Sequence, residues 1–274
     1  MSVFFGGRMS NVSGSYNFDA GQVYKACIEW IQGWFSANAN SKTIAVIGIS
    51  GGKDSALTAK LLTDALGKDR VVGVMLPNGK QKDIADSQKV CSFLGIKNYT
   101  ININNAYNGL TDELQKYLPA DNYSYANYKT NTPARLRMTT LYGIAAVLGN
   151  AMVANTCNLS EDVMGYSTFY GDSAGSFAPI SKLTTDEVVA LGDYAGMPKE
   201  IMHKAPSDGM CGKTDEESLG WTYHEVNELI RENKKGPHYE DIIERWKKNK
   251  FKLDIIQLPC FVPELPLYSV WGAK

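Results

Sequence analysis

The sequence predicts an α/β fold, namely a doubly wound, mostly parallel sheet flanked by helices and followed by C-terminal helices and an extended tail. Three observations predict it. Short apolar runs of strand length alternate with longer segments of helical periodicity between residues 43 and 156. The connections between them are short, which favours parallel strands joined through helices. A turn with two glycines, Ser50-Gly51-Gly52, follows the first apolar run and leads into a helix.

The first half of the chain provides most of this alternation. Asp19 is a suitable N-cap for a helix that runs to about Ser36. The apolar face of that helix would consist of Val23, Cys27, Ile31 and either Trp34 or Phe35. Strands are then predicted at 43–49, 71–76 and 98–103, and helices at 54–66, 83–94 and 105–118. Pro77-Asn78-Gly79 is typical of the turn that ends the second strand.

The second half is less regular. Residues 119–131 are rich in tyrosine and lack periodicity, which fits a lid, a subunit contact or a decorated surface loop. A helix at 132–149, with Pro133 in its first turn, precedes a strand at 151–156. Later helices are predicted at 184–195, 216–220, 222–234 and 238–249. Three prolines in 250–274 predict an extended strap there.

Composition narrows the class of protein. The 274 residues carry a net charge of −1, which fits one α/β domain over 18–274 with a tail at 250–274 and argues against a nucleic-acid partner. Residues 1–17 lack the order of a secretory signal and are interpreted as a loose leader. No segment is apolar enough to span a membrane. Five scattered cysteines, none in a Cys-x-x-Cys pair, favour a cytoplasmic protein without a zinc or iron–sulfur site.

The glycine loop, residues 50–55 (Ser-Gly-Gly-Lys-Asp-Ser), carries the strongest chemical signal. Glycines permit close backbone approach by a ligand, and the N-terminus of the next helix attracts phosphate. Asp54 at that helix start makes sense beside a phosphate if a divalent cation, Mg²⁺, bridges them. The loop is not a Walker A motif, because Gly52-Lys53 is followed by Asp54. An ordinary turn is the alternative, and Lys53 itself is more typical of a solvated lysine.

Further candidates follow the predicted strands and helices. Arg135 and Arg137 diverge on a helix, so one can reach a phosphate while the other serves an interface or a substrate; a solvated helix face is the alternative. Thr156 and Glu161 lie where the last strand ends, at the ligand-binding edge of a parallel sheet. Glu161 is a candidate second carboxylate for Mg²⁺, although Ser160-Glu161 also fits a plain helix start.

Two loops complete the set. The aromatic loop, residues 165–172 (Gly-Tyr-Ser-Thr-Phe-Tyr-Gly-Asp), suits either a wall for a flat ring with an acid nearby or a core-facing turn. Residues 206–220 form a polar loop in which Ser207 or Thr214 could donate to phosphate. The acidic run Asp215–Glu217 is most simply a helix N-terminus.

With these motifs in this order, residues 18–248 resemble the short, ammonia-using NAD⁺ synthetases. The matching segments are 50–55, 131–142, 156–161, 165–172, 206–209 and 214–220. The glycine loop alone resembles the whole ATP pyrophosphatase class. The resemblance implies ATP-dependent conversion of deamido-NAD⁺ and ammonia to NAD⁺, AMP and pyrophosphate, in a homodimer with deamido-NAD⁺ across the interface.

The resemblance also implies roles for individual residues. Asp54 and Glu161 would hold Mg²⁺, and with Asp172 they form the implied catalytic set. The ATP side would comprise Gly48, Ser50, Gly51, Gly52, Lys53, Asp54, Ser55, Arg137, Thr156 and Ser207. The deamido-NAD⁺ side would comprise Asn131, Arg135, Tyr142, Tyr166 and Asp172.

Two positions depart from the family pattern. Many members have a pyrophosphate-facing lysine where this chain has Thr185, and Lys182 is a possible substitute. Many also have a His-Lys-Arg run where this chain has Asn249-Lys250-Phe251, so no functional residue is transferred there.

The expected mechanism follows from carboxylate chemistry. Adenylation turns a carboxylate oxygen into part of a leaving group, after which neutral ammonia can attack, with Asp172 as a candidate base. A chain of this length filled by one such fold leaves no room for an amidase domain, so ammonia rather than glutamine is the expected donor. The alternatives are another ATP pyrophosphatase, either a GMP-synthetase-type amination enzyme or a tRNA thiolase, or a non-catalytic nucleotide sensor.

Overall fold

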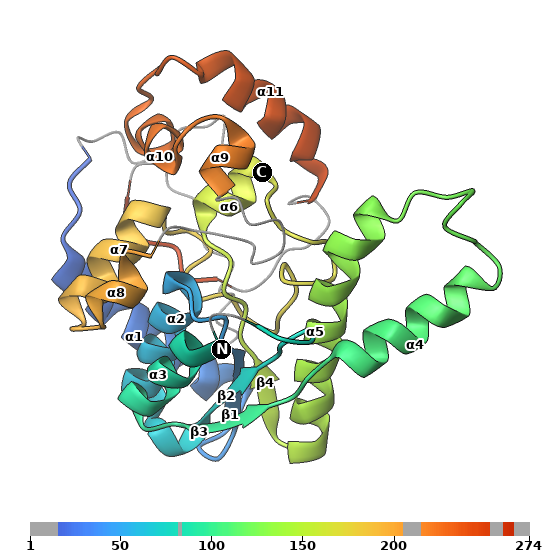
Figure 1. Cartoon of the computed structure of the whole chain (residues 1–274). Helices are drawn as coiled ribbons and strands as arrows, with labels where there is room; N and C mark the ends of the chain where they lie inside the picture. The colour runs from blue at the N-terminus through green and yellow to red at the C-terminus, as the bar shows by residue number, and fades with distance from the viewer. Residues whose placement is uncertain (1–15, 82–83, 205–214, 253–259, 266–274) are drawn as a thin grey trace.

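A four-stranded parallel sheet lies at the centre of the computed structural model, which describes residues 16–81, 84–204, 215–252 and 260–265 (Figure 1). The strands are β1 (Ile44–Gly48), β2 (Val71–Met75), β3 (Lys97–Thr100) and β4 (Ala151–Val153). Their order is β3-β2-β1-β4, and each neighbouring pair is parallel. Strands β2 and β3 therefore follow one another on one side of β1, and β4 pairs with β1 on its other side. This arrangement confirms the predicted doubly wound α/β fold.

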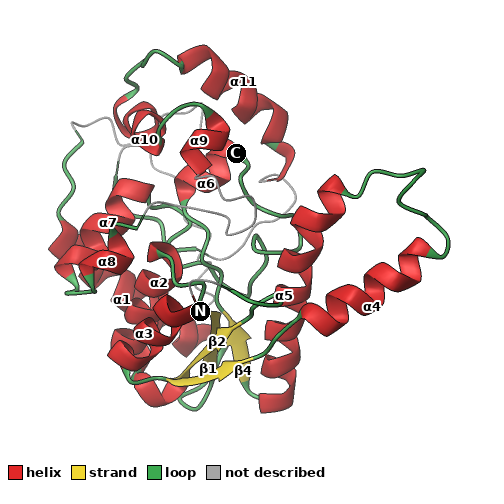
Figure 2. Cartoon of the chain, viewed as in Figure 1, coloured by secondary structure: helices red, strands yellow, loops and turns green. Residues whose placement is uncertain are grey.

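Helices surround this sheet and extend beyond it (Figure 2). Those of the first half are α1 (Ala20–Asn38), α2 (Lys53–Leu66), α3 (Ile84–Leu94), α4 (Asn104–Gln115) and α5 (Ala126–Leu148), with a 3₁₀ turn at Lys68–Arg70. Those of the second half are α6 (Leu159–Met164), α7 (Thr185–Tyr194), α8 (Lys199–Met202), α9 (Asp215–Leu219), α10 (Tyr223–Glu232) and α11 (Tyr239–Asn249).

Local sequence explains where these elements begin and what they bury. Asp19 caps α1 by accepting the N–H of Gln22 at 3.0 Å, as expected. All the residues expected on the apolar face of α1 are buried, including both Trp34 and Phe35. Every residue of β2 is buried, as its unbroken apolar run predicts for a strand covered on both faces.

The two faces of the sheet have separate cores. One core joins α1, α2, α3, α7 and α8 to one face of the sheet, and the stacked rings of Trp34 and Phe177 lie within it. The other core joins α5 to the opposite face through Met138, Leu141 and Ala145. Helix α4 and the start of α5 form a hairpin that projects from the body (Figure 1). No residue of α4 is buried.

A third core lies beyond the sheet, among α6, α9, α10 and α11. These helices form the upper part of the molecule in Figure 1. A buried ion pair fastens this helical unit to the sheet domain: Arg231 of α10 donates to Glu187 of α7 at 2.6 Å and 2.8 Å. The same guanidinium donates to the carbonyl of Lys182 at 2.7 Å.

The structure corrects several predicted boundaries. Helix α5 begins at Ala126 rather than at 132, so Pro133 lies inside the helix and not in its first turn. Tyr128 belongs to α5, where its hydroxyl contacts that of Thr111 on α4 at 2.8 Å. Tertiary contact with α4 thus extends the helix into a segment whose sequence has no helical periodicity. Helices α6 and α8 are additional short elements.

The ends of the chain are described only in part. The leader lies mostly outside the described residues, but Tyr16 donates to Glu187 at 3.1 Å. Of the predicted strap, Cys260 forms a parallel bridge with Ala178, and Phe261 is buried beside Trp30. Among the described residues, no helix combines the length and apolar character needed to cross a membrane.

Candidate active site

The glycine loop turns between the C-terminal end of β1 and the start of α2. The hydroxyls of Ser50 and Ser55 lie 3.0 Å apart, and the Ser55 hydroxyl donates to the carbonyl of Gly52 at 3.1 Å. Gly51 has a φ of +84°, and a Cβ there would approach the backbone N of Ser87 to 3.1 Å. The loop is therefore closed on itself by hydroxyls and leaves no space for a side chain at Gly51.

Asp54 and Glu161 form an acid pair joined by Asn158. The Asn158 amide donates to Asp54 Oδ1 at 2.9 Å. Its oxygen accepts the Glu161 N–H at 3.0 Å, while Glu161 Oε2 accepts the Asn158 N–H at 3.3 Å. Asn158 thus caps α6 and orients Asp54 at the same time. Burial, reinforced by the negative charge of Asp54, raises the pKa of Glu161 well above its usual range.

Lys53 is not the solvated lysine that its sequence context suggested. Its side chain is only 5% exposed, and its Nζ lies 2.9 Å from Asp54 Oδ2. Its charge also opposes the rise in the pKa of Glu161. The reason for the discrepancy is tertiary: α7 and α8 pack over the start of α2 and cover a residue that an isolated helix start would expose.

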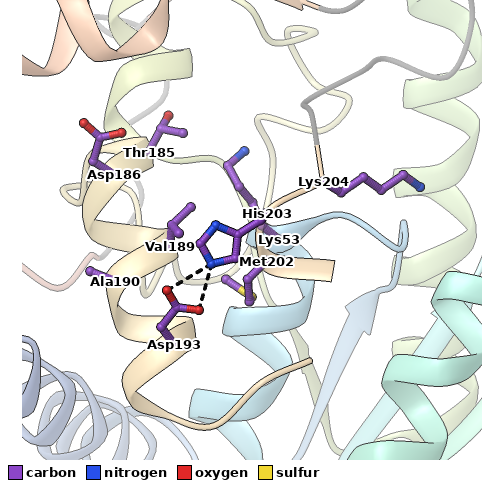
Figure 3. Close-up of a pocket in the computed structure, with 9 residues that line it drawn as sticks. All are labelled: Lys53, Thr185, Asp186, Val189, Ala190, Asp193, Met202, His203 and Lys204. Atoms are coloured by element: carbon purple, nitrogen blue, oxygen red, sulfur yellow. Dashed lines mark hydrogen bonds and ion pairs between the residues drawn. The ribbon is translucent and has the colours of Figure 1, made fainter. Parts of the chain in front are cut away.

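A cavity of about 440 Å³ opens beside the glycine loop (Figure 3). Its lining residues are Lys53, Thr185, Asp186, Val189, Ala190, Asp193, Met202, His203 and Lys204. The cavity brings Lys53 together with Thr185, the position where relatives were expected to have a lysine. His203 bonds to Asp193 at 3.0 Å, whereas Lys204 extends away from the other lining residues and pairs with Asp86 at 2.7 Å.

The aromatic loop lies against α5. Thr168 donates to the side chain of Asn131 at 3.0 Å, and Arg135 Nε donates to the carbonyl of Phe169 at 3.1 Å. Tyr170 is in the left-handed region with a φ of 58°, and its ring lies 61% exposed. The loop is therefore a held, open wall rather than a core-facing turn.

Asp172 closes this loop. Its carboxylate accepts the Thr168 N–H at 2.8 Å, and its carbonyl accepts from the Asn155 amide at 2.8 Å. Surrounding protein raises the pKa of Asp172, although the bond from Thr168 and the charge of Lys252 oppose the rise. Burial lowers the pKa of Arg137, and the negative charge of Asp172 opposes that shift. Arg137 Nε donates to the carbonyl of Leu76 at 3.0 Å.

For the other predicted site residues the structure gives a position in the fold. Thr156 lies three residues beyond the end of β4, between buried Asn155 and Cys157, and not within the strand as predicted. Gly48 is the last residue of β1. Tyr142 is 41% exposed on α5 and two turns beyond Arg135. Ser207 lies outside the described residues.

Sequence reasoning missed three residues that organise the site. Asn155 holds the carbonyl oxygens of Asp172 and Ala174, and Asn158 joins the acid pair. Lys252 reaches the aromatic loop from beyond α11. The Asn158-x-x-Glu161 spacing is a capping-box signal that could have identified Asn158. Nothing local to the sequence marks Asn155 or Lys252.

The acid pair fits a divalent cation whose remaining ligands come from phosphate. Within the described ranges, no group of three or more His, Cys, Asp or Glu residues could hold a metal by itself. Asp54 and Glu161 are near enough for the charge of Asp54 to help raise the pKa of Glu161. Carboxylate oxygens are the donors that Mg²⁺ uses together with substrate phosphates. The donor set is therefore compatible with Mg²⁺ bound together with a nucleotide.

A family model, curated sequences and solved structures that are similar to this chain all come from NAD or NMN synthetases. A family model described as NAD synthase matches residues 23–258. An NH(3)-dependent NAD(+) synthetase of Pyrococcus furiosus is 40% identical over 192 residues, covering 70% of this chain and 72% of that protein. The structure of an NMN synthetase from Francisella tularensis matches with a TM-score of 0.78 and 31% identity over 89% of this chain and 100% of that chain. An NH3-dependent NAD synthetase from Campylobacter jejuni matches with a TM-score of 0.69 and 28% identity, covering 90% and 100%.

Proposed function

The chain belongs to the NAD synthase family, and from that premise we propose that it is a ligase that amidates deamido-NAD⁺ with ammonia. In this reaction a carboxylate oxygen of the nicotinate attacks the α-phosphorus of ATP, and pyrophosphate leaves. Ammonia then attacks the acyl carbon of the adenylate, and AMP leaves with the pair of electrons of the C–O bond. The products are NAD⁺, AMP and pyrophosphate.

The observation that carries the proposal is the position of the acid pair beside the glycine loop. The start of α2 offers backbone N–H groups and a partial positive charge to a polyphosphate. Asp54 stands in the first turn of that helix and is fixed by Asn158 opposite Glu161. A purely phosphate-binding turn has no need for two fixed carboxylates, whereas a nucleotide that arrives with a divalent cation does.

Asp54 and Glu161 are the residues that would hold Mg²⁺. When bound there, Mg²⁺ would neutralise the charge that develops on departing pyrophosphate. Lys53 would have the same electrostatic effect from the protein side, because its side chain lines the cavity beside the glycine loop and is only 5% exposed. We assign to Lys53 the pyrophosphate-facing role that Thr185 cannot supply. Lys182 is a weaker candidate, since its charge acts on Asp162.

The nicotinate end of the substrate is assigned to the aromatic loop and α5. Asn131 and Arg135 hold the loop and lie beside it on one helix. Tyr166 offers an aromatic face, and Asp172 an acid whose pKa is raised by its surroundings. A carboxylate with a raised pKa is better matched to taking a proton from ammonium or from the tetrahedral intermediate than an ordinary aspartate. This is the role proposed for Asp172.

The exposed hairpin supports the proposal of a homodimer. Helix α4 has no buried residue, and every residue of β3 is exposed. Helices α4 and α5 and the segment between them also carry large apolar residues that are exposed to solvent, namely Leu110, Tyr117, Tyr142 and Val147. Large apolar side chains left exposed on neighbouring elements favour a subunit contact there. Because α5 also carries Asn131 and Arg135, such a dimer would place the substrate near the partner subunit.

A second candidate substrate is nicotinic acid mononucleotide. The Francisella tularensis protein is called an NMN synthetase, and its structure matches this chain with a higher TM-score and identity than that of the Campylobacter jejuni NAD synthetase. Amidation of the mononucleotide uses the same acyl chemistry and would require only a shorter site beyond the ribose phosphate.

The test is incubation of the purified chain with ATP, Mg²⁺ and ammonium, and with either deamido-NAD⁺ or nicotinic acid mononucleotide. The proposal expects AMP and pyrophosphate in equal amounts with the amidated nucleotide, and the ratio of kcat/KM for the two acids identifies the substrate. Release of ADP and orthophosphate would contradict it. Turnover with glutamine as sole nitrogen source, free of ammonium, would contradict the assignment of ammonia.

A further inference from the structure

We propose that Lys252 is a positioning residue for the aromatic loop, and that through it the end of α11 sets the geometry of the nicotinate site; this inference rests on the function proposed above. Lys252 lies three residues beyond the C-terminal residue of α11 and is partly buried. Family resemblance implies no functional role for this part of the chain.

The Lys252 ammonium binds two backbone carbonyls of the aromatic loop. Its Nζ donates to the carbonyl of Gly165 at 2.6 Å and to that of Ser167 at 2.9 Å. An ammonium has three donors and a full charge, so each of these bonds is stronger than one between neutral groups. The two carbonyls flank Tyr166, so the backbone on both sides of that ring is fixed by one side chain.

Two residues of α11 itself contact the same segment. Arg245 Nε donates to the carbonyl of Met164 at 2.9 Å, and its guanidinium lies 5.9 Å from the centre of the Tyr166 ring. Asn249 packs so closely on Gly165 that any side chain at position 165 would collide with the side chain of Asn249. Arg245 and Asn249 are four residues apart and so lie on one face of α11. Lys252 continues this contact beyond the end of the helix, at the start of the loop.

The opposite side of the loop is held by α5. Asn131 accepts from Thr168, and Arg135 donates to Phe169. The loop thus lies between two helices from distant parts of the sequence, with α5 on its middle and the end of α11 on its start. Because α5 carries proposed substrate contacts, the distance between those contacts and the Tyr166 ring depends on how α11 holds Gly165 and Ser167.

Lys252 also acts on the charge at the other end of the loop. It is among the groups that favour the ionised form of Asp172, along with the N–H and hydroxyl of Thr168, while the surrounding protein opposes ionisation. Burial and the positive charge of Arg245 lower the pKa of Lys252, whereas the charge of Asp172 raises it. One lysine therefore couples the position of the ring at one end of the loop to the charge of the acid at the other.

The test compares full-length wild type with Lys252→Met, Lys252→Arg and the control Lys250→Met, whose side chain is exposed two residues away. For Lys252→Met we expect the KM for the nicotinate substrate to rise roughly tenfold, the loss typical of one hydrogen bond to a charged group, with the KM for ATP unchanged. Lys252→Arg should recover part of the loss, and Lys250→Met should resemble wild type. The acidic limb of the pH profile should move to higher pH in Lys252→Met, because Asp172 loses a cation.

Hydrogen exchange provides a readout that does not depend on activity. Amides of residues 166–172 should exchange at least several-fold faster in Lys252→Met than in wild type or Lys250→Met, while those of β1 and α2 should not change. If the wild type proves inactive on both nicotinate acids, the proposed function fails, yet the exchange comparison still tests Lys252. Unchanged exchange in the aromatic loop, or equal rises in the KM for both substrates, would overturn the inference.

Discussion

The glycine loop and the aromatic loop are built in opposite ways. The glycine loop lies between two consecutive elements, β1 and α2, and its closing bonds join residues at most five positions apart. The aromatic loop is held by α5 and by the end of α11, whose contacts with it span 34 to 87 positions. The first is a local motif on a rigid strand end, and the second is a product of tertiary docking. We expect the two to fail differently when perturbed.

The largest expected effect is at the acid pair. Asp54→Asn should reduce kcat by about 10²–10³, since removal of one preorganised electrostatic contact typically costs roughly 3–4 kcal/mol of barrier. AMP formation measured at saturating ATP and Mg²⁺ checks this. Asp69→Asn, an exposed acid in the 3₁₀ turn that follows α2, is the matched control and should leave kcat unchanged. A mutant with normal AMP formation would mean that the glycine loop works without its acid.

The next largest effect is a loss of stability that should affect the helices around the aromatic loop before the elements around the glycine loop. Arg231→Met leaves Glu187 buried without its cation, which should cost about 3–5 kcal/mol and lower Tm by roughly 10 °C. Thermal unfolding measures the loss, and hydrogen exchange should rise in α10 and α11 before it rises in β1 and α2. The double variant Arg231→Met with Glu187→Met should recover much of the stability. Uniform loosening of both regions would remove the distinction between them.

A smaller effect is expected for Lys53→Met. Since Lys53 lines the cavity beside the glycine loop, its loss should raise the KM for ATP and weaken product inhibition by pyrophosphate by roughly tenfold, the scale of one lost bond to a charged group. The KM for the nicotinate substrate should stay constant, which is the reverse of the pattern expected for Lys252→Met. Steady-state kinetics with each substrate varied in turn decides between them. Lys68→Met, an exposed lysine in the 3₁₀ turn that follows α2, is the control.

The smallest effect is a pH dependence near the acid pair. Burial raises the pKa of Asp162 to about 7, with Lys182 opposing the rise. The folded chain therefore binds more protons than the unfolded chain between the ordinary aspartate pKa of about 4 and pH 7, so the contribution of Asp162 to stability falls as pH rises through that window. Asp162→Asn should raise Tm by a few degrees above pH 7 and have little effect near pH 4. Equal shifts at both pH values would exclude Asp162 as the source.

The same contrast explains how much could be predicted. The strands, most helices of the first half and the glycine loop follow from periodicity and local turn chemistry, although β3 and β4 end earlier than predicted, at Thr100 and Val153. Lys53 was misjudged because α7 and α8 cover it, and the start of α5 because Tyr128 packs on α4. Lys252 gave no signal at all, since its partners are the carbonyls of Gly165 and Ser167, and backbone acceptors carry no sequence information.

Asn158 shows how a substitution table can mislead in this protein. Aspartate and serine are among the best residues for beginning a helix, so a mutational scan scored only on helix formation would rank them as tolerated at this position. Neither can both receive the Glu161 N–H and present a directed amide N–H to Asp54. Depletion of these two variants in a selection for growth would therefore report the aim of one carboxylate, and not the integrity of the short helix that follows.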